Sequence, residues 1–147
     1  MTATPAPNIM QTYQQIKQKH QEAYNKIMDD SGVFWAFSNE QFAEGLEKLK
    51  TSGQLLPGDK LARVTGGGLV PSKNADKMME LLKQADKTQK QKLKQAKQAK
   101  NEAILYELQN HECFYTGDYS PVIDIFKGIY TPADIKKVYQ ANININD

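Results

Sequence analysis

The stretch between Pro71 and Gly117 contains neither glycine nor proline, and no other feature of the sequence constrains the fold as strongly. Glycine and proline are the residues that most often interrupt a helix. Along this stretch the apolar side chains recur at steps of three and four, interrupted once at Gln89, as one face of a helix requires: Met78, Leu82, Ala85, Leu93, Ala96, Ala99 (or Lys100) and Ala103. The pattern predicts a helix over residues 74–113, about 55–60 Å long at roughly 1.5 Å per residue. A break near Asp86–Thr88, which would produce a helical hairpin, is the alternative.

A second helical pattern lies near the N-terminus, over residues 8–30. Its apolar positions form one narrow stripe, like the seam of a coiled coil: Ile9, Tyr13, Ile16, His20 and Ile27. Such a stripe needs one partner helix rather than a broad core. The sequence therefore predicts that residues 8–30 and 83–103 pair as an antiparallel helical stalk. Gly32 follows the pattern and is suited to the left-handed conformation that ends a helix.

The most apolar segment of the chain is Val33–Phe37, which predicts a short buried strand or an extended connection. Ser38 follows this segment, and a glutamine stands three residues later, which is the arrangement of a helix-capping box. The helix predicted after this cap covers residues 39–51. Phe37 and Phe42 have the spacing of a hydrophobic staple across the cap.

A small hairpin is predicted around the glycine-rich sequence TGGGL, with residues 61–65 returning through residues 69–70. Pro71 cannot donate a ladder hydrogen bond, so the second strand is expected at an edge of the sheet. Two short helices are predicted near the C-terminus. Ser120 is expected to cap the first and Thr131 the second, because a proline follows each of them at a first helical position.

Together these elements predict a mainly α fold of the α+β class, with a small β-hairpin and a compact head that carries a long helical arm or two-helix stalk. Aromatic residues from three segments are expected to form the core of the head: Phe34, Trp35, Phe37, Phe42, Phe114, Tyr115, Tyr119, Phe126 and Tyr130. The expected organisation is a disordered tail over residues 1–7 and a single domain over 8–147, with a stalk of 8–30 and 83–103 and a head of 32–82 and 104–141.

The composition disfavours several classes of protein. A single cysteine cannot form an intramolecular disulfide, which is consistent with a reducing compartment. No apolar run approaches the length of a membrane span, and the N-terminus lacks the pattern of a signal peptide. We therefore expect a soluble cytoplasmic protein. Arg63 is the only arginine among nineteen basic residues, so a set of bidentate arginine contacts to phosphate or guanine cannot be built.

Positive charge is concentrated between Lys83 and Lys100, where seven lysines accompany one acidic residue. A basic helix face can neutralise the phosphates of a nucleic acid or enter an acidic groove of a protein. No aromatic residue is interleaved, so bases would have nothing on which to stack. An ordinary solvated helix face is the competing interpretation, and a membrane-surface role is disfavoured because the opposite face carries only Leu93 and alanines. The candidate partner-binding residues are Lys83, Lys87, Lys90, Lys94, Lys97 and Lys100.

His111, Glu112 and Cys113 form the densest cluster of reactive side chains. Neighbours on a helix point about 100° apart, so these three cannot ligate one metal ion together or form a nucleophile pair. His20 is the only other histidine, and no second cysteine exists to complete a site. The TGGGL sequence lacks the Lys-Ser/Thr pair that a phosphate-binding loop needs after its last glycine. The sequence therefore predicts no catalytic residue, cofactor or metal site, and a protein that is not an enzyme.

Three motifs resemble those of a small family carried by bacteriophages, prophages and mobile elements of gut bacteria. They are FWAFSNEQFAEG at residues 34–45, VTGGGLVPS at 64–72 and YELQNHECFYTGD at 106–118. The family pattern has a phenylalanine where this chain has Trp35. The resemblance implies no activity. It implies a setting, in which small accessory proteins inhibit host defence and include anti-CRISPR proteins that bind Cas effectors.

We therefore expect a non-enzymatic accessory protein in the cytoplasm of a host bacterial cell. It would bind and inhibit a host protein or protein–nucleic-acid complex, such as a Cas effector, through the lysine-rich helix, while the head supplies an apolar anchor. Direct nucleic-acid binding by the same lysines is the alternative. A homodimer formed through the two seam helices is a further alternative.

Overall fold

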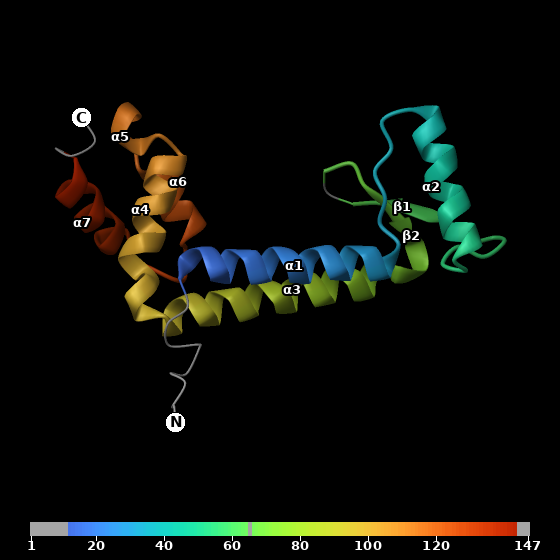
Figure 1. Cartoon of the computed structure of the whole chain (residues 1–147), viewed down its shortest axis with the longest axis horizontal. Helices are drawn as coiled ribbons and strands as arrows, with labels where there is room; N and C mark the ends of the chain where they lie inside the picture. The colour runs from blue at the N-terminus through green and yellow to red at the C-terminus, as the bar shows by residue number, and fades with distance from the viewer. Residues whose placement is uncertain (1–11, 65, 144–147) are drawn as a thin grey trace, which may run out of the picture. The chain divides into compact units, whose positions relative to one another are not determined.

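The computed structural model describes residues 12–64 and 66–143 (Figure 1). The predicted class is confirmed, because the described chain is mainly helical and contains one small antiparallel hairpin. The helices are α1 (Tyr13–Ser31), α2 (Asn39–Thr51), α3 (Ser72–Gln95), η1 (Lys97–Ala99, a 3₁₀ helix), α4 (Lys100–Asn110), α5 (Cys113–Thr116), α6 (Ser120–Ile125) and α7 (Pro132–Asn142). The strands are β1 (Leu61–Arg63) and β2 (Leu69–Pro71). The predicted tail over residues 1–7 lies outside the described residues.

The chain divides into two compact units, and α1 and α3 contribute to both of them. The hairpin unit is Lys19–Lys87, and the helical unit combines Met1–Gln18 with Thr88–Asp147. Residues 32–82 and 104–141 were expected to form one head. These two segments lie in different units, each with its own buried side chains.

The long helix predicted over residues 74–113 is interrupted, but not at Asp86–Thr88, where α3 is continuous. The interruption is at Ala96, whose φ of −85° and ψ of 69° are not helical. In an unbroken helix the Leu93 carbonyl accepts from the N–H four residues later. Here the Tyr130 hydroxyl donates to that carbonyl at 3.4 Å. Neither glycine nor proline lies at the break, so it could not be predicted from the local sequence.

The core of the helical unit is built around α4, which packs against α5, α6 and α7. Helix α1 adds Tyr13 and Ile16 to this core, and Tyr13 contacts the Phe126 ring with 6.1 Å between centroids. The largest fully buried side chains of this core are Ile16, Ile104, Leu108, Cys113, Val122, Phe126 and Ile135.

One buried carboxylate joins α1 to α4. Glu107 is only 4% exposed, yet it accepts hydrogen bonds from the Tyr13 hydroxyl and, at 3.0 Å, from Lys17 Nζ. Burial, followed by the nearby Glu107, raises the pKa of Tyr13, so this hydroxyl remains a donor across the physiological range. The Tyr13 backbone N–H also donates to Glu102 Oε1 at 2.9 Å. The start of α1 is therefore fixed to α4 by polar contacts as well as by packing.

Helices α1 and α3 contact each other within the hairpin unit, whereas the predicted stalk paired residues 8–30 with 83–103. At one end, Asn74 Nδ2 donates to the Ser31 carbonyl at 2.9 Å. At the other, Asp86 bonds to His20 at 2.9 Å and accepts from the Tyr24 hydroxyl at 2.8 Å. Since early residues of α3 contact late residues of α1, the two helices run antiparallel here.

The hairpin forms where it was predicted, with Ala62 opposite Val70 in an antiparallel ladder. As expected, β2 is an edge strand, because the sheet has two strands only among the residues that the structure describes. An isolated bridge adds one contact on its outer side, where Phe34 and Leu69 exchange two backbone hydrogen bonds of 2.9 Å. Pro71 is tolerated in β2 because its pair with Leu61 alternates with the hydrogen-bonded pairs of the ladder.

The Val33–Phe37 segment is extended, but the expected burial of its aromatic residues is only partial. Phe34 packs against Gly45 of α2, where an added Cβ would lie 2.2 Å from the ring. Trp35 is 44% exposed and Phe37 is 85% exposed. The staple between Phe37 and Phe42 is therefore absent, and Phe42 approaches Phe34 instead, at 6.2 Å between ring centroids.

Two of the three predicted helix caps are confirmed. Ser38 Oγ accepts from the Gln41 N–H at 3.2 Å, and α2 has the predicted bounds. Thr131 and Asp134 form a reciprocal capping box at the start of α7. Ser120 does not cap α6 but belongs to it, and both its N–H and its hydroxyl donate to Asp118.

We predict that Gly45→Ala destabilises the protein by about 1–3 kcal/mol, because the new methyl group would overlap the Phe34 ring. In an open helix position the same change would stabilise by roughly 0.5–1 kcal/mol. Urea unfolding measures the difference. Introduced together with Phe34→Ala, which removes the ring, Gly45→Ala should become stabilising. A stabilising effect of Gly45→Ala alone would contradict the packing described here.

Candidate functional site

The structure distributes the six candidate lysines over three elements and both units. Lys83, Lys87, Lys90 and Lys94 lie on α3, Lys97 lies on η1, and Lys100 begins α4. Lys83 and Lys87 belong to the hairpin unit and the other four to the helical unit. The continuous helical face predicted from spacing therefore ends at the Ala96 break. All six are exposed except Lys100, which is half-buried.

Because the helix is interrupted at Ala96, three of the lysines lie around one hollow of the helical unit. Lys94, Lys97 and Lys100 line a hollow of about 380 Å³ together with Leu93, Ile129, Tyr130 and Asp134. We call this the lysine-lined hollow. Ile129, Tyr130 and Asp134 lie some thirty or more residues later in the chain. They could not be predicted as part of the site, because no local pattern in the sequence connects them to the lysines.

The three lysines of the hollow differ in their partners. Lys100 Nζ is 2.8 Å from Asp134 Oδ1 and lies 5.9 Å from the centroid of the Tyr130 ring. This ammonium group, together with the Thr131 N–H, lowers the pKa of Asp134. Lys94 and Lys97 have no ion pair or hydrogen bond to any side chain that the structure describes. Two cationic groups therefore remain available beside an apolar floor.

The excess positive charge lies in the helical unit. Its described residues, 12–18 and 88–143, hold nine lysines and six acidic residues, a formal excess of +3. The hairpin unit, residues 19–87, holds ten basic and ten acidic residues and is formally neutral. The unit with the excess positive charge, which could attract an acidic ligand, is therefore also the unit that carries the lysine-lined hollow.

The reactive cluster at residues 111–113 spans the junction between α4 and α5. His111 ends α4, and Glu112 adopts a left-handed conformation with φ of 56°. His111 Nε2 is 3.7 Å from Glu107 Oε1, whereas Cys113 is fully buried in the core. Burial, with a smaller contribution from Asp118, raises the pKa of the Cys113 thiol. Across residues 12–64 and 66–143, no three His, Cys, Asp or Glu side chains are placed to share a metal ion.

Helix α5 exposes one of its two aromatic side chains and packs the other. Tyr115, which was expected in the core of the head, is 91% exposed. Phe114 does pack, and its ring stacks on Tyr139 with 5.3 Å between centroids and 4° between planes.

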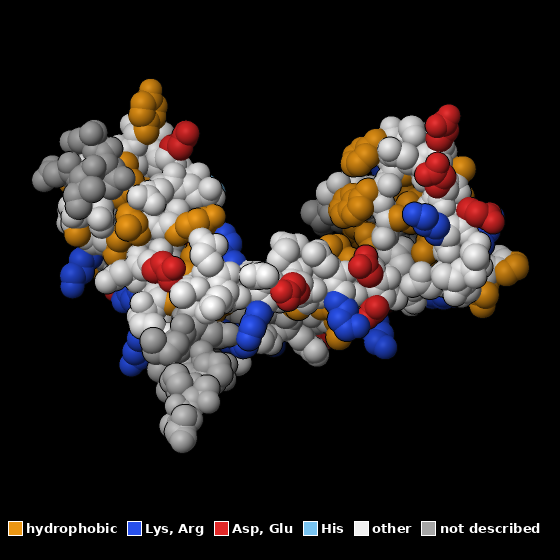
Figure 2. Space-filling model, in the orientation of Figure 1, with side chains coloured by type: hydrophobic (Ala, Val, Ile, Leu, Met, Phe, Trp, Pro, Cys, Tyr) orange, Lys and Arg blue, Asp and Glu red, His pale blue; other side chains and the backbone are white. Residues whose placement is uncertain are grey.

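The hairpin unit also exposes three aromatic side chains, Trp35, Phe37 and Phe42, which together are here called the aromatic surface. The Trp35 ring covers the glycine-rich turn, where a Cβ added to Gly68 would lie 3.0 Å from it. Gly66 and Gly67 have φ of 93° and 94°, which side chains rarely adopt. Figure 2 shows hydrophobic side chains exposed on this unit. Aromatic side chains are enriched at contact sites between proteins.

Residues 12–144 match the family described as "Family of unknown function (DUF7659)", and the chain belongs to that family. No curated protein matched the chain, and no solved structure matched it. Of the helices described, none is both long and apolar enough to span a bilayer.

We predict that Cys113 of the folded protein reacts with a thiol reagent at neutral pH about 100-fold or more slowly than in the unfolded chain, because the thiol is buried and its pKa is raised. The pKa of this thiol is higher in the folded protein than in the unfolded chain, where it is about 8.5. The resulting contribution to the free energy of unfolding is therefore fully present below about pH 8.5 and is lost as the pH rises through the pKa of the folded protein. Labelling followed by mass spectrometry measures the rate. Thr116→Cys on a Cys113→Ala background provides an exposed control, and equally fast labelling of the native Cys113 would reopen a catalytic role.

Proposed function

We propose that this member of the family is a non-enzymatic binding protein whose lysine-lined hollow receives an acidic, partly apolar segment of a partner protein. One observation supports this most directly. Lys94 and Lys97 are exposed and lack ion-pair partners among the described side chains, while Leu93, Ile129 and Tyr130 line the same hollow. Carboxylates would pair with the two ammonium groups, and an apolar side chain of the same segment would cover the floor.

The surroundings of the hollow favour an acidic protein segment over nucleic acid. Binding of single strands relies on aromatic faces that stack on bases. Tyr130, the aromatic residue of the hollow, is only 8% exposed, because its ring packs against Phe126 at 5.0 Å between centroids. The cationic groups are lysines, which act as point charges and do not clamp phosphate in a bidentate manner.

The aromatic surface of the hairpin unit would supply the apolar anchor of the interaction. Phe37 is 85% exposed and its neighbour Trp35 is 44% exposed. Large aromatic side chains bury much apolar area on binding and are common at the energetic centres of interfaces. The two surfaces provide different chemistry, which is charge in the helical unit and apolar area in the hairpin unit.

The biological setting of the proposal rests on the resemblance of the three sequence motifs. In that setting the partner is a protein or nucleoprotein complex of a bacterial host, and the bound protein inhibits it. An anti-CRISPR-like inhibitor that binds a Cas effector is the specific form of this proposal. Occupation of a groove that the host protein needs would be enough for inhibition, without any chemical step.

Direct nucleic-acid binding is the second candidate function. It is supported by the +3 formal excess of the helical unit and by the exposed Lys90, Lys94 and Lys97. Such binding would depend steeply on salt concentration, because each neutralised phosphate releases counterions.

We predict that Lys94→Glu combined with Lys97→Glu weakens binding of an acidic peptide that carries leucine side chains by roughly tenfold or more, about 1.4 kcal/mol. The loss follows because both unpaired ammonium groups of the hollow become carboxylates. Fluorescence anisotropy with a labelled peptide of this type measures the dissociation constant. Lys83→Glu combined with Lys87→Glu is the matched control, since it changes the net charge equally but at positions of α3 that lie outside the hollow.

The two pairs of variants separate the alternatives. A similar loss for both pairs would show general electrostatic attraction and would overturn a site at the hollow. A labelled DNA duplex and a labelled RNA strand, titrated over a range of salt, test the second candidate. Tighter binding of either nucleic acid than of the peptide, with a steep salt slope, would favour nucleic acid as the ligand.

A further inference from the structure

The hairpin has a hydrogen-bonding pattern that leaves main-chain groups of β1 pointing away from β2. Val64 N–H donates to the Gly68 carbonyl at 2.8 Å, and Ser72 N–H donates to the Lys60 carbonyl at 2.7 Å. Hydrogen-bonded pairs alternate along an antiparallel ladder, so Ala62 and Val70 form the pair between these two. Leu61 and Arg63 therefore direct their N–H and C=O groups toward the outer edge.

The two edges of the hairpin differ. On the β2 side, Phe34 and Leu69 exchange their N–H and C=O groups, and Pro71 has no N–H to offer. On the β1 side, no described residue bonds to the outward groups of Leu61 and Arg63. An exposed edge with alternating donors and acceptors is a template for another extended chain.

A hollow beside the start of β1 could receive a side chain from such an added strand. It has a volume of about 830 Å³ and is lined mainly by apolar residues of α2 and of the loop before β1. The residues with apolar side chains are Leu46, Leu55, Leu56, Pro57 and Leu61.

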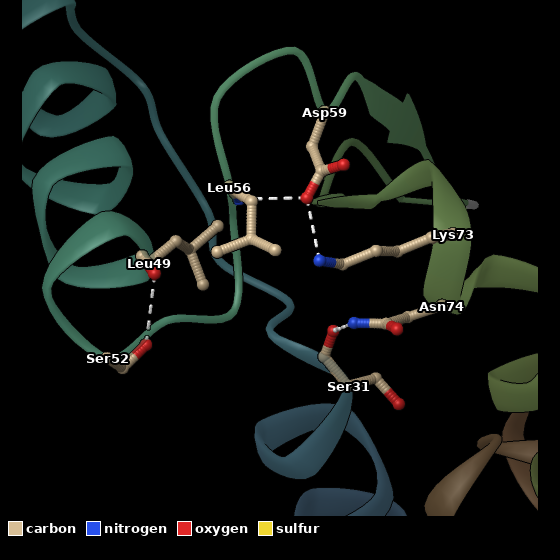
Figure 3. Close-up of polar contacts among 7 residues, drawn as sticks. All are labelled: Ser31, Leu49, Ser52, Leu56, Asp59, Lys73 and Asn74. Carbon is tan, nitrogen blue, oxygen red and sulfur yellow. Dashed lines mark hydrogen bonds and ion pairs between the residues drawn. The ribbon is translucent and has the colours of Figure 1, made fainter.

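Local hydrogen bonds hold the loop of this hollow in place (Figure 3). Asp59 Oδ2 accepts from Lys73 Nζ at 2.6 Å and from the Leu56 N–H at 2.8 Å. At the other end of the loop, Ser52 Oγ donates to the Leu49 carbonyl at 3.1 Å. The apolar hollow is therefore formed before any ligand arrives, which lowers the entropic cost of binding.

The charges around this edge indicate what kind of segment it suits. Lys50 and Lys60 line the hollow, and Arg63 is exposed on β1. The one acidic residue of the lining, Asp59, is already paired with Lys73. The free charge at the edge is thus positive, and an acidic residue in the added strand would complement it.

We propose that the outer edge of β1 binds an extended segment of a partner protein by strand addition, with a large apolar side chain in the adjacent hollow and acidic residues beside it. The main chain would supply affinity through Leu61 and Arg63, and the hollow would select the side chain. This site is separate from the lysine-lined hollow and uses no residue of it. Either site can therefore fail its test while the other stands.

The test starts from a display library of random linear peptides selected against the full chain. Enrichment of peptides that alternate large apolar and acidic residues is expected. Binding of such a peptide should slow amide hydrogen exchange at Leu61 and Arg63, because their N–H groups become hydrogen-bonded. Selected peptides that leave exchange at both residues unchanged, or a selection that enriches nothing, would overturn the proposal.

A pair of substitutions at one position isolates the main-chain contact. Arg63→Pro removes the outward N–H but none that β2 uses, whereas Arg63→Ala removes only the side-chain charge. The proline variant should bind the selected peptide roughly tenfold more weakly than the alanine variant, through loss of one interfacial hydrogen bond. Circular dichroism checks that both variants fold. Equal affinities of the two folded variants would exclude strand addition at this edge, and unchanged affinity of Lys94→Glu with Lys97→Glu would confirm that the two sites are separate.

Discussion

The helical unit depends on a carboxylate that has almost no contact with water. Glu107 would be strongly destabilising at this depth without partners, since a buried charge without compensation costs several kcal/mol. Tyr13 and Lys17, both from the first two turns of α1, provide those partners. The N-terminal helix is thereby attached to α4, and α5, α6 and α7 pack around that same helix. Because the Lys17 side chain is 37% exposed, the ion pair is partly screened, and its value lies as much in positioning α1 as in free energy.

The Ala96 break has a comparable role for the candidate site. Ala96 and Ala99 are 4% and 1% exposed, so the turn between α3 and α4 is packed into the core instead of continuing into solvent. With the chain turning there, Lys97 and Lys100 no longer follow Lys94 along a straight helix. These three lysines surround a common hollow instead. The spacing in the sequence suggested a long basic helix, whereas the fold produces a local site with apolar residues at its base.

Local signals in the sequence predicted local structure well. Ser38 defines the start of α2, and Thr131 with Asp134 defines the start of α7. Features that depend on distant residues could not be predicted in this way. The break at Ala96 involves Tyr130, and the exposure of Trp35 follows from the alternation in which Phe34 faces α2. Gly45 was a usable signal, because a glycine inside a helix often marks the close approach of another group. The lysines were named from spacing alone, but only the fold distinguishes Lys94, Lys97 and Lys100 from Lys83 and Lys87.

The two units are suited to different steps of binding, because the helical unit carries the net charge and the hairpin unit carries the open strand edge and the exposed aromatic side chains. Long-range attraction depends on net charge, and the formal excess of +3 belongs to the helical unit. A formally neutral hairpin unit contributes little to that attraction, yet it carries the exposed aromatic side chains and the open strand edge. Contacts of these kinds act at short range and mainly slow dissociation. A partner that met both units would therefore associate at a rate set by lysines and salt, and would dissociate at a rate set by apolar and main-chain contacts. Salt would then change the association rate far more than the dissociation rate.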